Sequence, residues 1–237
     1  MVLCFFSDSP LDHEEERQSK NTLNHFVLRQ EGTPFERDIL TAPCVSVDAC
    51  LWCVYQANPL TCACAQVSLR YRILNGDLGK YRFYQNQFQH MWCTPLPSQC
   101  ERTHPLLSLW CEACFCNGCA LSANRLVVMD AYDLRTSGTD LRLIRFSNFM
   151  QGAACICNCF AICNSNCSRL SLILDCLAGL VYHCVSGCMT AQVVHEMDIR
   201  SGDSFQYEAS PYWSETLPAG QQISEGSYEP YQRINRT

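Results

Sequence analysis

The residues most able to do chemistry in this sequence are its cysteines, which occupy 20 of 237 positions. Three C-x-x-C pairs each place two thiols within one turn of chain, the spacing with which zinc sites gather their ligands. The sequence therefore predicts zinc bound by thiolates at one or more of these pairs. The pairs are Cys50/Cys53, Cys111/Cys114 and Cys116/Cys119.

The first pair belongs to a longer cluster of thiols. Cys62 and Cys64 follow it, so the segment CLWCVYQANPLTCAC places four thiols within fifteen residues. Four thiolates at this spacing can complete a tetrahedral zinc site. The alternative is structural, because an unpaired cysteine packs like a small hydrophobic residue on a buried helix face.

A denser cluster follows, in which CEACFCNGC holds four cysteines in nine residues. A proline-rich stretch with two cysteines and a histidine precedes it, and a loop joined to a helix start is a common way to close a zinc site. On one regular helix Cys111, Cys114 and Cys116 cannot all point to one metal, so two or three of them at most share a site. The candidate zinc ligands of the whole chain are Cys50, Cys53, Cys62, Cys64, Cys93, Cys100, His104, Cys111, Cys114, Cys116 and Cys119.

The cysteines nearer the C-terminus recur every four or eight residues, which puts them on one face of a helix. Small residues such as Gly152 and Gly187 accompany them. This pattern favours two helices packed closely through inward-facing cysteine stripes, with acylation or a shared metal as the alternatives. The two stripes are Cys155/Cys159/Cys163 and Cys176/Cys184/Cys188.

Catalytic motifs are missing from the sequence. It has no GxxxxGK[ST], GxGxxG or GxSxG motif, and HEMD at positions 195–198 carries only the first histidine of HExxH. We therefore predict a protein that is not an enzyme, with a thiol redox enzyme as the alternative. Lys and Arg total 17 against 23 Asp and Glu, a net charge of −6, which argues against binding of nucleic acid through a basic face.

Apolar periodicity predicts a mainly α-helical, cysteine-rich domain over residues 39–203. Two helices with a break at Pro59 are expected within 49–74, and one long helix with a kink at Gly118 is expected from Leu106. The dipeptide Asn75-Gly76 opens a segment expected to be a loop or short hairpin. Two apolar segments, 143–163 and 170–197, are joined by a polar connector and predict a C-terminal helical hairpin.

Polar arms flank this domain, an N-terminal arm over residues 1–38 and an extended tail over 204–237. Acidic residues concentrate in the arms, whereas 19 of the 20 cysteines lie between Cys44 and Cys188. The tail carries aromatic residues but few aliphatic ones, so it cannot bury enough surface to fold alone. We expect both arms to bind protein partners in a large assembly, with Tyr212 and Trp213 as the strongest anchors.

The N-terminal sequence MVLCFFSDSPLDHEEERQ lacks a basic region and soon becomes acidic. It matches neither a secretory signal nor an Arg-rich transit peptide, so we expect a cytoplasmic protein, with the cilium or flagellum as a candidate compartment. Reduced thiols in the cytosol favour metal binding over disulfides. Membrane spanning is not favoured, because residues such as Arg145, Asn158 and Asp175 interrupt the apolar segments of the hairpin; membrane association is kept as the alternative.

Three stretches resemble a known family. They are GTPFERDILTAPC, CEACFCNGCALSANRLVVMDAYDLRTSGTDLRLIRFSNFMQGAACICNCFAI and LILDCLAGLVYHCVSGCMTAQVVHEMDIRSGD. Over about residues 32–203 the chain resembles the placenta-specific-eight (cornifelin-like) Cys-rich family, in its plant and protist branch. The resemblance implies a small, often membrane-associated protein linked to organ size, metal tolerance and stress, without an established enzymatic reaction. The CCxxxxCPC element of other members has no match here, so only Cys111, Cys114 and Cys116 are carried over, as framework positions.

Together these features predict a non-enzymatic, zinc-stabilised structural or scaffold protein that acts within a larger assembly, with axonemal and organellar assemblies as candidate hosts. The alternative is a peripheral membrane protein of metal homeostasis.

Overall fold

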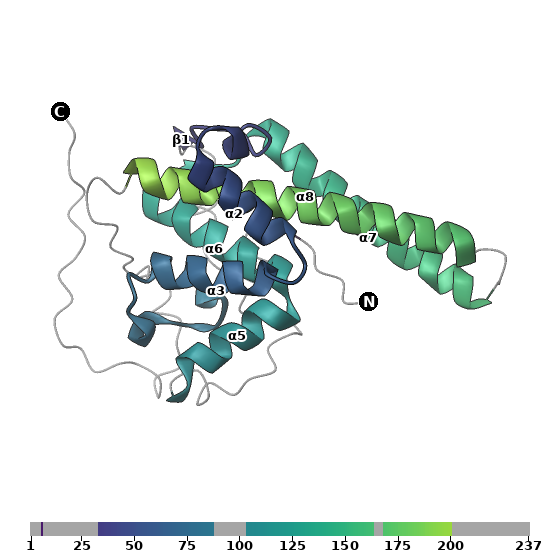
Figure 1. The fold of residues 1–237 in the computed structure, drawn as a ribbon, viewed down its shortest axis with the longest axis horizontal. Coiled ribbons are helices and arrows are strands. Elements are labelled where there is room, and N and C mark those ends of the chain that lie inside the picture. The colour runs from purple at the N-terminus through teal and green to yellow at the C-terminus, as the bar shows by residue number, and fades with distance from the viewer. Residues whose placement is uncertain (1–5, 7–32, 88–102, 164–167, 201–237) are drawn as a thin grey trace, which may run out of the picture. The chain divides into compact units, whose positions relative to one another are not determined.

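A computed structural model describes residues 6, 33–87, 103–163 and 168–200 of the chain (Figure 1). This part is mainly helical, which confirms the predicted fold class. The expected anchor residues of the tail, and the stretch 1–5 and 7–32 of the N-terminal arm, lie outside the described residues. The elements in chain order are β1 (Thr33–Pro34), η2 (Ala42–Cys44), α2 (Val47–Ala57), α3 (Cys62–Ile73), η3 (Leu78–Lys80), η4 (Phe83–Asn86), α5 (Pro105–Phe115), α6 (Asn117–Tyr132), β2 (Leu134–Arg135), α7 (Gly138–Cys163) and α8 (Ser168–Arg200).

The helix pair α2 and α3 begins and ends at residues with a clear local preference. The Ser46 hydroxyl caps α2 by accepting a hydrogen bond from the Ala49 N–H at 3.1 Å. Asn58 ends the helix in an extended conformation ahead of Pro59. The predicted arrangement of helix, break and helix is therefore confirmed.

A tight turn ends α3 as expected from Asn75-Gly76, which have φ angles of 52° and 78°. A Cβ on Gly76 would also lie 3.1 Å from the Tyr71 hydroxyl oxygen, so both the backbone angle and the space favour glycine. The following segment forms the short 3₁₀ turns η3 and η4 where a loop or hairpin was expected.

The prediction of a single long helix from Leu106 is wrong. The chain forms α5 and α6, whose axes are bent by 115°. The break lies at Cys116, with φ −143° and ψ 76°, and Gly118 continues α6 without a kink. α6 is buried along most of its length and packs against α3 and α8, with Leu126, Val127 and Val193 in the shared core. The sharp turn thus places α6 in the core of the domain, between α3 and α8.

A small parallel pair of strands, β1 and β2, joins residues far apart in sequence, with Thr33 beside Leu134. It adds a minor β element to the helical domain. Asp133 precedes β2 with a left-handed φ of 52° and ends α6.

The predicted hairpin is confirmed as α7 and α8, which pack against each other and run side by side in Figure 1. The prediction that its cysteine stripes face inward is wrong, because Cys159, Cys176 and Cys184 are exposed. Ala154 and Ala178 fill the interface instead. Helical periodicity identifies which residues share a face, but the smaller alanines fit where the two backbones come closest.

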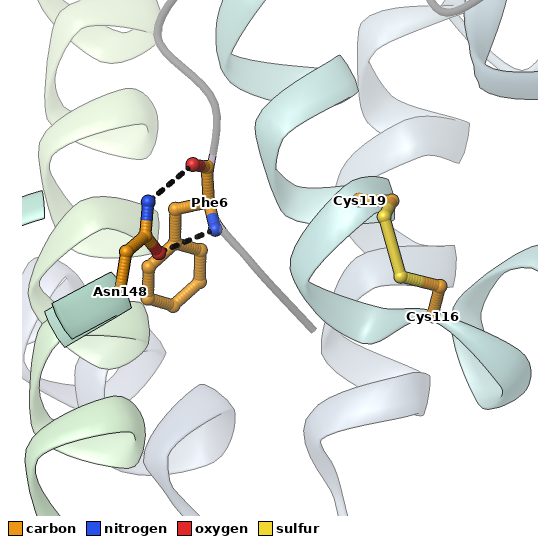
Figure 2. The surroundings of a disulfide bond; sticks show 4 residues. All are labelled: Phe6, Cys116, Cys119 and Asn148. Atoms are coloured by element: carbon orange, nitrogen blue, oxygen red, sulfur yellow. Dashed lines mark hydrogen bonds between the residues drawn. A yellow bond between two sulfur atoms is a disulfide. The ribbon is translucent and has the colours of Figure 1, made fainter. Parts of the chain in front are cut away.

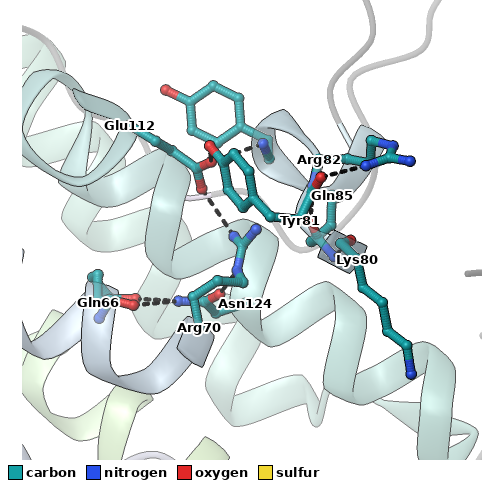
Figure 3. A network of polar contacts seen from close by, with 9 residues as sticks. Gln66, Arg70, Lys80, Tyr81, Arg82, Gln85, Glu112 and Asn124 are labelled. Carbon is teal, nitrogen blue, oxygen red and sulfur yellow. Dashed lines mark hydrogen bonds and ion pairs between the residues drawn. The ribbon is translucent and has the colours of Figure 1, made fainter. Parts of the chain in front are cut away.

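The core of the domain is unusually polar at its centre (Figure 3). Arg70 on α3 forms a fully buried ion pair with Glu112 on α5, at 2.9 Å between Nη2 and Oε1. The second Glu112 oxygen accepts hydrogen bonds from the Tyr81 hydroxyl and the Tyr84 N–H, each at 2.9 Å. Burial raises the pKa of Glu112, and the Arg70 charge together with these hydrogen bonds opposes that rise.

The network continues from Arg70 across other helices. Arg70 donates from Nε to the Asn124 side-chain oxygen, and Asn124 donates to Gln66 Oε1 at 2.8 Å. Gln66 in turn donates to Gln56 Oε1 at 2.8 Å, and Gln56 donates to Asn117 Oδ1 at 2.7 Å. This chain of directional contacts connects α2, α3, α5 and α6 and fixes their relative rotation.

Arg70→Met should lower the free energy of unfolding by about 3–5 kcal/mol, because it leaves the buried Glu112 carboxylate without its counter-charge. Arg72→Met is the matched control two residues along α3, where the partner is the half-exposed Asp198, and should change it by about 0–1 kcal/mol. Urea unfolding followed by circular dichroism measures both. Equal effects of the two substitutions would show that the buried network does not stabilise the domain.

Candidate thiol site and exposed arm

α2 and α8 come very close to each other at Gly187. A Cβ at this position would lie 2.6 Å from the Cys53 carbonyl oxygen and 3.1 Å from its sulfur. Only glycine lets the two helix backbones come this close. The neighbouring residue on α8, Cys188, is thereby brought to the Cys53 side chain.

The two thiols form a pair between the helices. Their interaction lowers the pKa of Cys53 from 9.0 to about 7, and partial burial acts in the opposite direction. The same interaction, burial and the nearby Cys53, Cys184 and Cys44 thiols raise the pKa of Cys188. A lowered pKa favours the thiolate of Cys53, the form in which cysteine acts as a nucleophile or soft metal ligand.

The structure divides the first predicted zinc cluster. Cys50 is exposed on α2, whereas Cys53 is half-buried and pairs with Cys188, a residue that the sequence analysis assigned to a packing stripe. Cys62 and Cys64 lie at the start of α3. Burial raises the pKa of Cys62, to which the nearby Cys114 and Cys64 thiols contribute.

The second predicted cluster is also rearranged. Cys116 and Cys119 form a disulfide across the start of α6 (Figure 2), where reduced thiols were expected. Cys111 is half-buried and Cys114 is exposed, both on α5, and His104 precedes that helix. Cys93 and Cys100 lie outside the described residues.

Zinc coordination does not fit the described arrangement as it stands. Within residues 33–87, 103–163 and 168–200, no three His, Cys, Asp or Glu side chains are grouped so that they could hold one ion. The disulfide removes two of the predicted thiolate ligands from metal binding. Cys114, which belongs to the second sequence cluster, lies close enough to Cys62 of the first for its charge to raise the pKa of Cys62 slightly.

The Cys53–Cys188 pair could not be found from motif spacing, because its members are more than a hundred residues apart. One sequence signal was nevertheless present. A glycine inside a helical pattern, such as Gly187, often has a packing reason, and here another helix backbone comes close to it.

The second candidate site is a surface. We call residues 146–163 of α7 and 170–184 of α8 the apolar arm. It exposes large hydrophobic side chains on both helices, with Ile162 87% and Phe149 68% exposed. The exposed set is Phe146, Phe149, Ile156, Phe160 and Ile162 on α7 and Leu170, Leu172, Ile173, Leu177 and Leu180 on α8.

Among the described residues, α8 is long and apolar enough to cross a membrane, and the bent pair α5 and α6 would pass the same test if it were one broken span. Length and composition alone are weak grounds, because a core helix of a soluble protein shares them. About a quarter of the apolar window in α8 is buried inside the domain, 28%. Most of that window is therefore available for contact with something outside the domain.

Comparisons of the chain with protein-family models, with curated proteins and with solved structures find no match. The resemblance to the cornifelin-like family therefore stays a prediction.

Alkylation of Cys53 by iodoacetamide should show a midpoint near pH 7, because the interaction with Cys188 favours its thiolate. Cys188→Ala removes this partner and should move the midpoint up toward the ordinary value of 9.0. Cys188→Ser keeps a polar partner and should leave the midpoint low. Peptide mass spectrometry measures modification at Cys53, and an unchanged midpoint in Cys188→Ala would contradict the assigned pair.

Proposed function

We propose that this protein is a non-enzymatic structural protein that attaches to a larger body through the apolar arm. The observation that carries the proposal is the exposure of ten large hydrophobic side chains on the arm. A monomeric soluble protein rarely leaves so many large apolar side chains of one helix pair in water, and large exposed apolar patches mark contact sites.

The architecture also supports a role in attachment. The arm projects from the same two helices whose other ends are held in the domain, where Gln192 on α8 donates to Asp140 at the start of α7, at 2.8 Å. A surface on rigid elements keeps a fixed position relative to the domain that carries it. The domain thus acts as the base from which the arm is presented.

The attachment role can be tested by removing the arm at a point where its two helices touch. Gln151 donates to the Ala178 carbonyl oxygen at 3.2 Å, so residues 152–177 can be replaced by a short glycine-serine linker. In the cells that produce the protein, the full chain should sediment with the particulate fraction and the excised variant should stay in the supernatant, because the variant has lost most of its exposed apolar side chains. Circular dichroism melting checks that the variant is folded.

A matched control keeps the arm and changes exposed apolar residues elsewhere. Val47, Leu51 and Val54 form an exposed stripe on α2, and their replacement by lysine should leave sedimentation unchanged. Equal sedimentation of the excised variant and the full chain would refute attachment through the arm.

Zinc stabilisation is a second proposal, supported by the C-x-x-C spacing of the sequence. Elemental analysis of reduced, purified protein should find at least one zinc per chain. Chelators should then lower the melting temperature, because the binding free energy contributes to folding. Substoichiometric metal, or melting unaffected by chelators, would contradict a zinc-stabilised domain.

A further inference from the structure

The apolar arm lacks the polar outer face that a water-exposed helical hairpin has. Residues 146–163 and 170–184 contain no Lys, Arg or Glu. Asp175 is the one carboxylate in these two stretches. A helix that is hydrophobic all round is normally enclosed, either by a large protein core or by lipid.

The exposed apolar positions are spread around each helix. At about 100° per residue, Phe149 and Ile162 lie about 140° apart around the α7 axis, and Leu172 and Leu177 are separated by about the same angle on α8. All four are exposed. A flat protein surface or a second copy of the chain would cover one side of such a hairpin, whereas lipid covers all of its outward sides.

Several polar side chains of the arm are hydrogen-bonded between the helices, whereas Ser147 Oγ and His183 Nδ1 are buried without a hydrogen-bond partner. Asn158 donates to both Asp175 oxygens, at 2.8 and 3.0 Å, and accepts a hydrogen bond from the Ser171 hydroxyl. Gln151 donates across to the Ala178 carbonyl oxygen at 3.2 Å. Internal pairing of this kind is required where no water is available to satisfy polar groups.

At the base of the arm, Asn148 is also satisfied within the chain. Its side-chain oxygen accepts from the Phe6 N–H at 2.9 Å and its amide donates to the Phe6 carbonyl oxygen at 2.8 Å (Figure 2). The Phe6 ring stacks on Tyr182 at 4.8 Å. Asn148, Asn158 and Asp175, which interrupt the apolar sequence of the hairpin, thus have hydrogen-bond partners within the chain, and this weakens the sequence argument against membrane contact.

The length and charged ends of the arm match a lipid bilayer. Residues 146–163 form about 27 Å of helix, close to the ~30 Å thickness of the hydrocarbon core, and residues 170–184 form about 22 Å, most of that thickness. Arg142 and Arg145 are exposed before its base and Arg169 is exposed at its far end. Arginines at these two levels can pair with lipid phosphates at the two surfaces.

We propose that the apolar arm inserts as a helical hairpin into a lipid bilayer, with the domain formed by α2, α3, α5 and α6 held at one membrane surface. This inference rests on the proposed attachment function and names lipid as the body to which the protein attaches. The carboxyl group of Asp175 enters the membrane together with its Asn158 partner.

Flotation with vesicles of phosphatidylcholine and a minority of phosphatidylserine tests the insertion of the purified full chain. The protein should float with the vesicles and stay bound in high salt and in alkaline carbonate, which release proteins held by charge alone. The triple variant Ile156→Lys, Phe160→Lys, Ile173→Lys should reduce the bound-to-free ratio by at least about a hundredfold, because each charge would enter hydrocarbon. The triple lysine variant of Val47, Leu51 and Val54 is the control and should float like the unchanged protein.

Two results would overturn the inference. In the first, the full chain does not float with vesicles, but the excised variant no longer sediments in cells. The protein then attaches through the arm, and the target is a protein rather than lipid. In the second, the full chain stays as a dimer in detergent-free buffer and hydrogen exchange protects the arm without lipid, so that a second copy covers it. If the excised variant still sediments in cells and the full chain does not float, the proposed attachment function fails as well.

Discussion

The buried ion pair of Arg70 and Glu112 is the constraint on which the helical domain depends. Two charges removed from water destabilise the fold unless each is paired and hydrogen-bonded, so the surrounding segments must deliver partners at fixed positions. Glu112 obtains them from Arg70, from the Tyr81 hydroxyl and from the Tyr84 backbone. An apolar core tolerates small sliding of helices, whereas these directional bonds permit one arrangement, in which the unusual backbone of η4 brings the Tyr84 N–H to the carboxylate.

α8 serves two different environments within one continuous helix. Its C-terminal part is buried in the domain, with Met189 and Val193 in the core, and its N-terminal part carries the exposed leucines of the apolar arm. The change falls near Gly187, where α2 presses against α8. Gln66 of the polar network also donates to the Thr190 hydroxyl at 3.3 Å, so the network holds the buried part of α8.

The helical fold class and the hairpin could be predicted because they depend on local apolar periodicity. Residues that break helices or form turns, such as Pro59 and Asn75-Gly76, marked the ends of α2 and α3. It could not predict the break at Cys116, since no proline marks it and a tertiary contact, the hydrogen bond from Gln56 to Asn117, stabilises the turned chain. Periodicity also could not say which face of α7 and α8 is inward. Cys53 meets Cys188 because two helices that are distant in sequence cross there. The C-x-x-C spacing instead paired Cys53 with Cys50, its neighbour in the sequence.

The segment before α2 is held by residues from the far end of the chain. The Ile39 N–H donates to Asp140 at 2.8 Å, Gln192 donates to the Arg37 carbonyl oxygen at 2.6 Å, and the Glu36 N–H donates to Glu196. During synthesis this segment leaves the ribosome first but cannot reach its final contacts until Glu196 has emerged. Both helices of the apolar arm leave the ribosome before that moment, so their hydrophobic surface meets the cell while the domain is still unfinished. The order of synthesis therefore gives whatever covers the arm its first opportunity to bind before folding is complete.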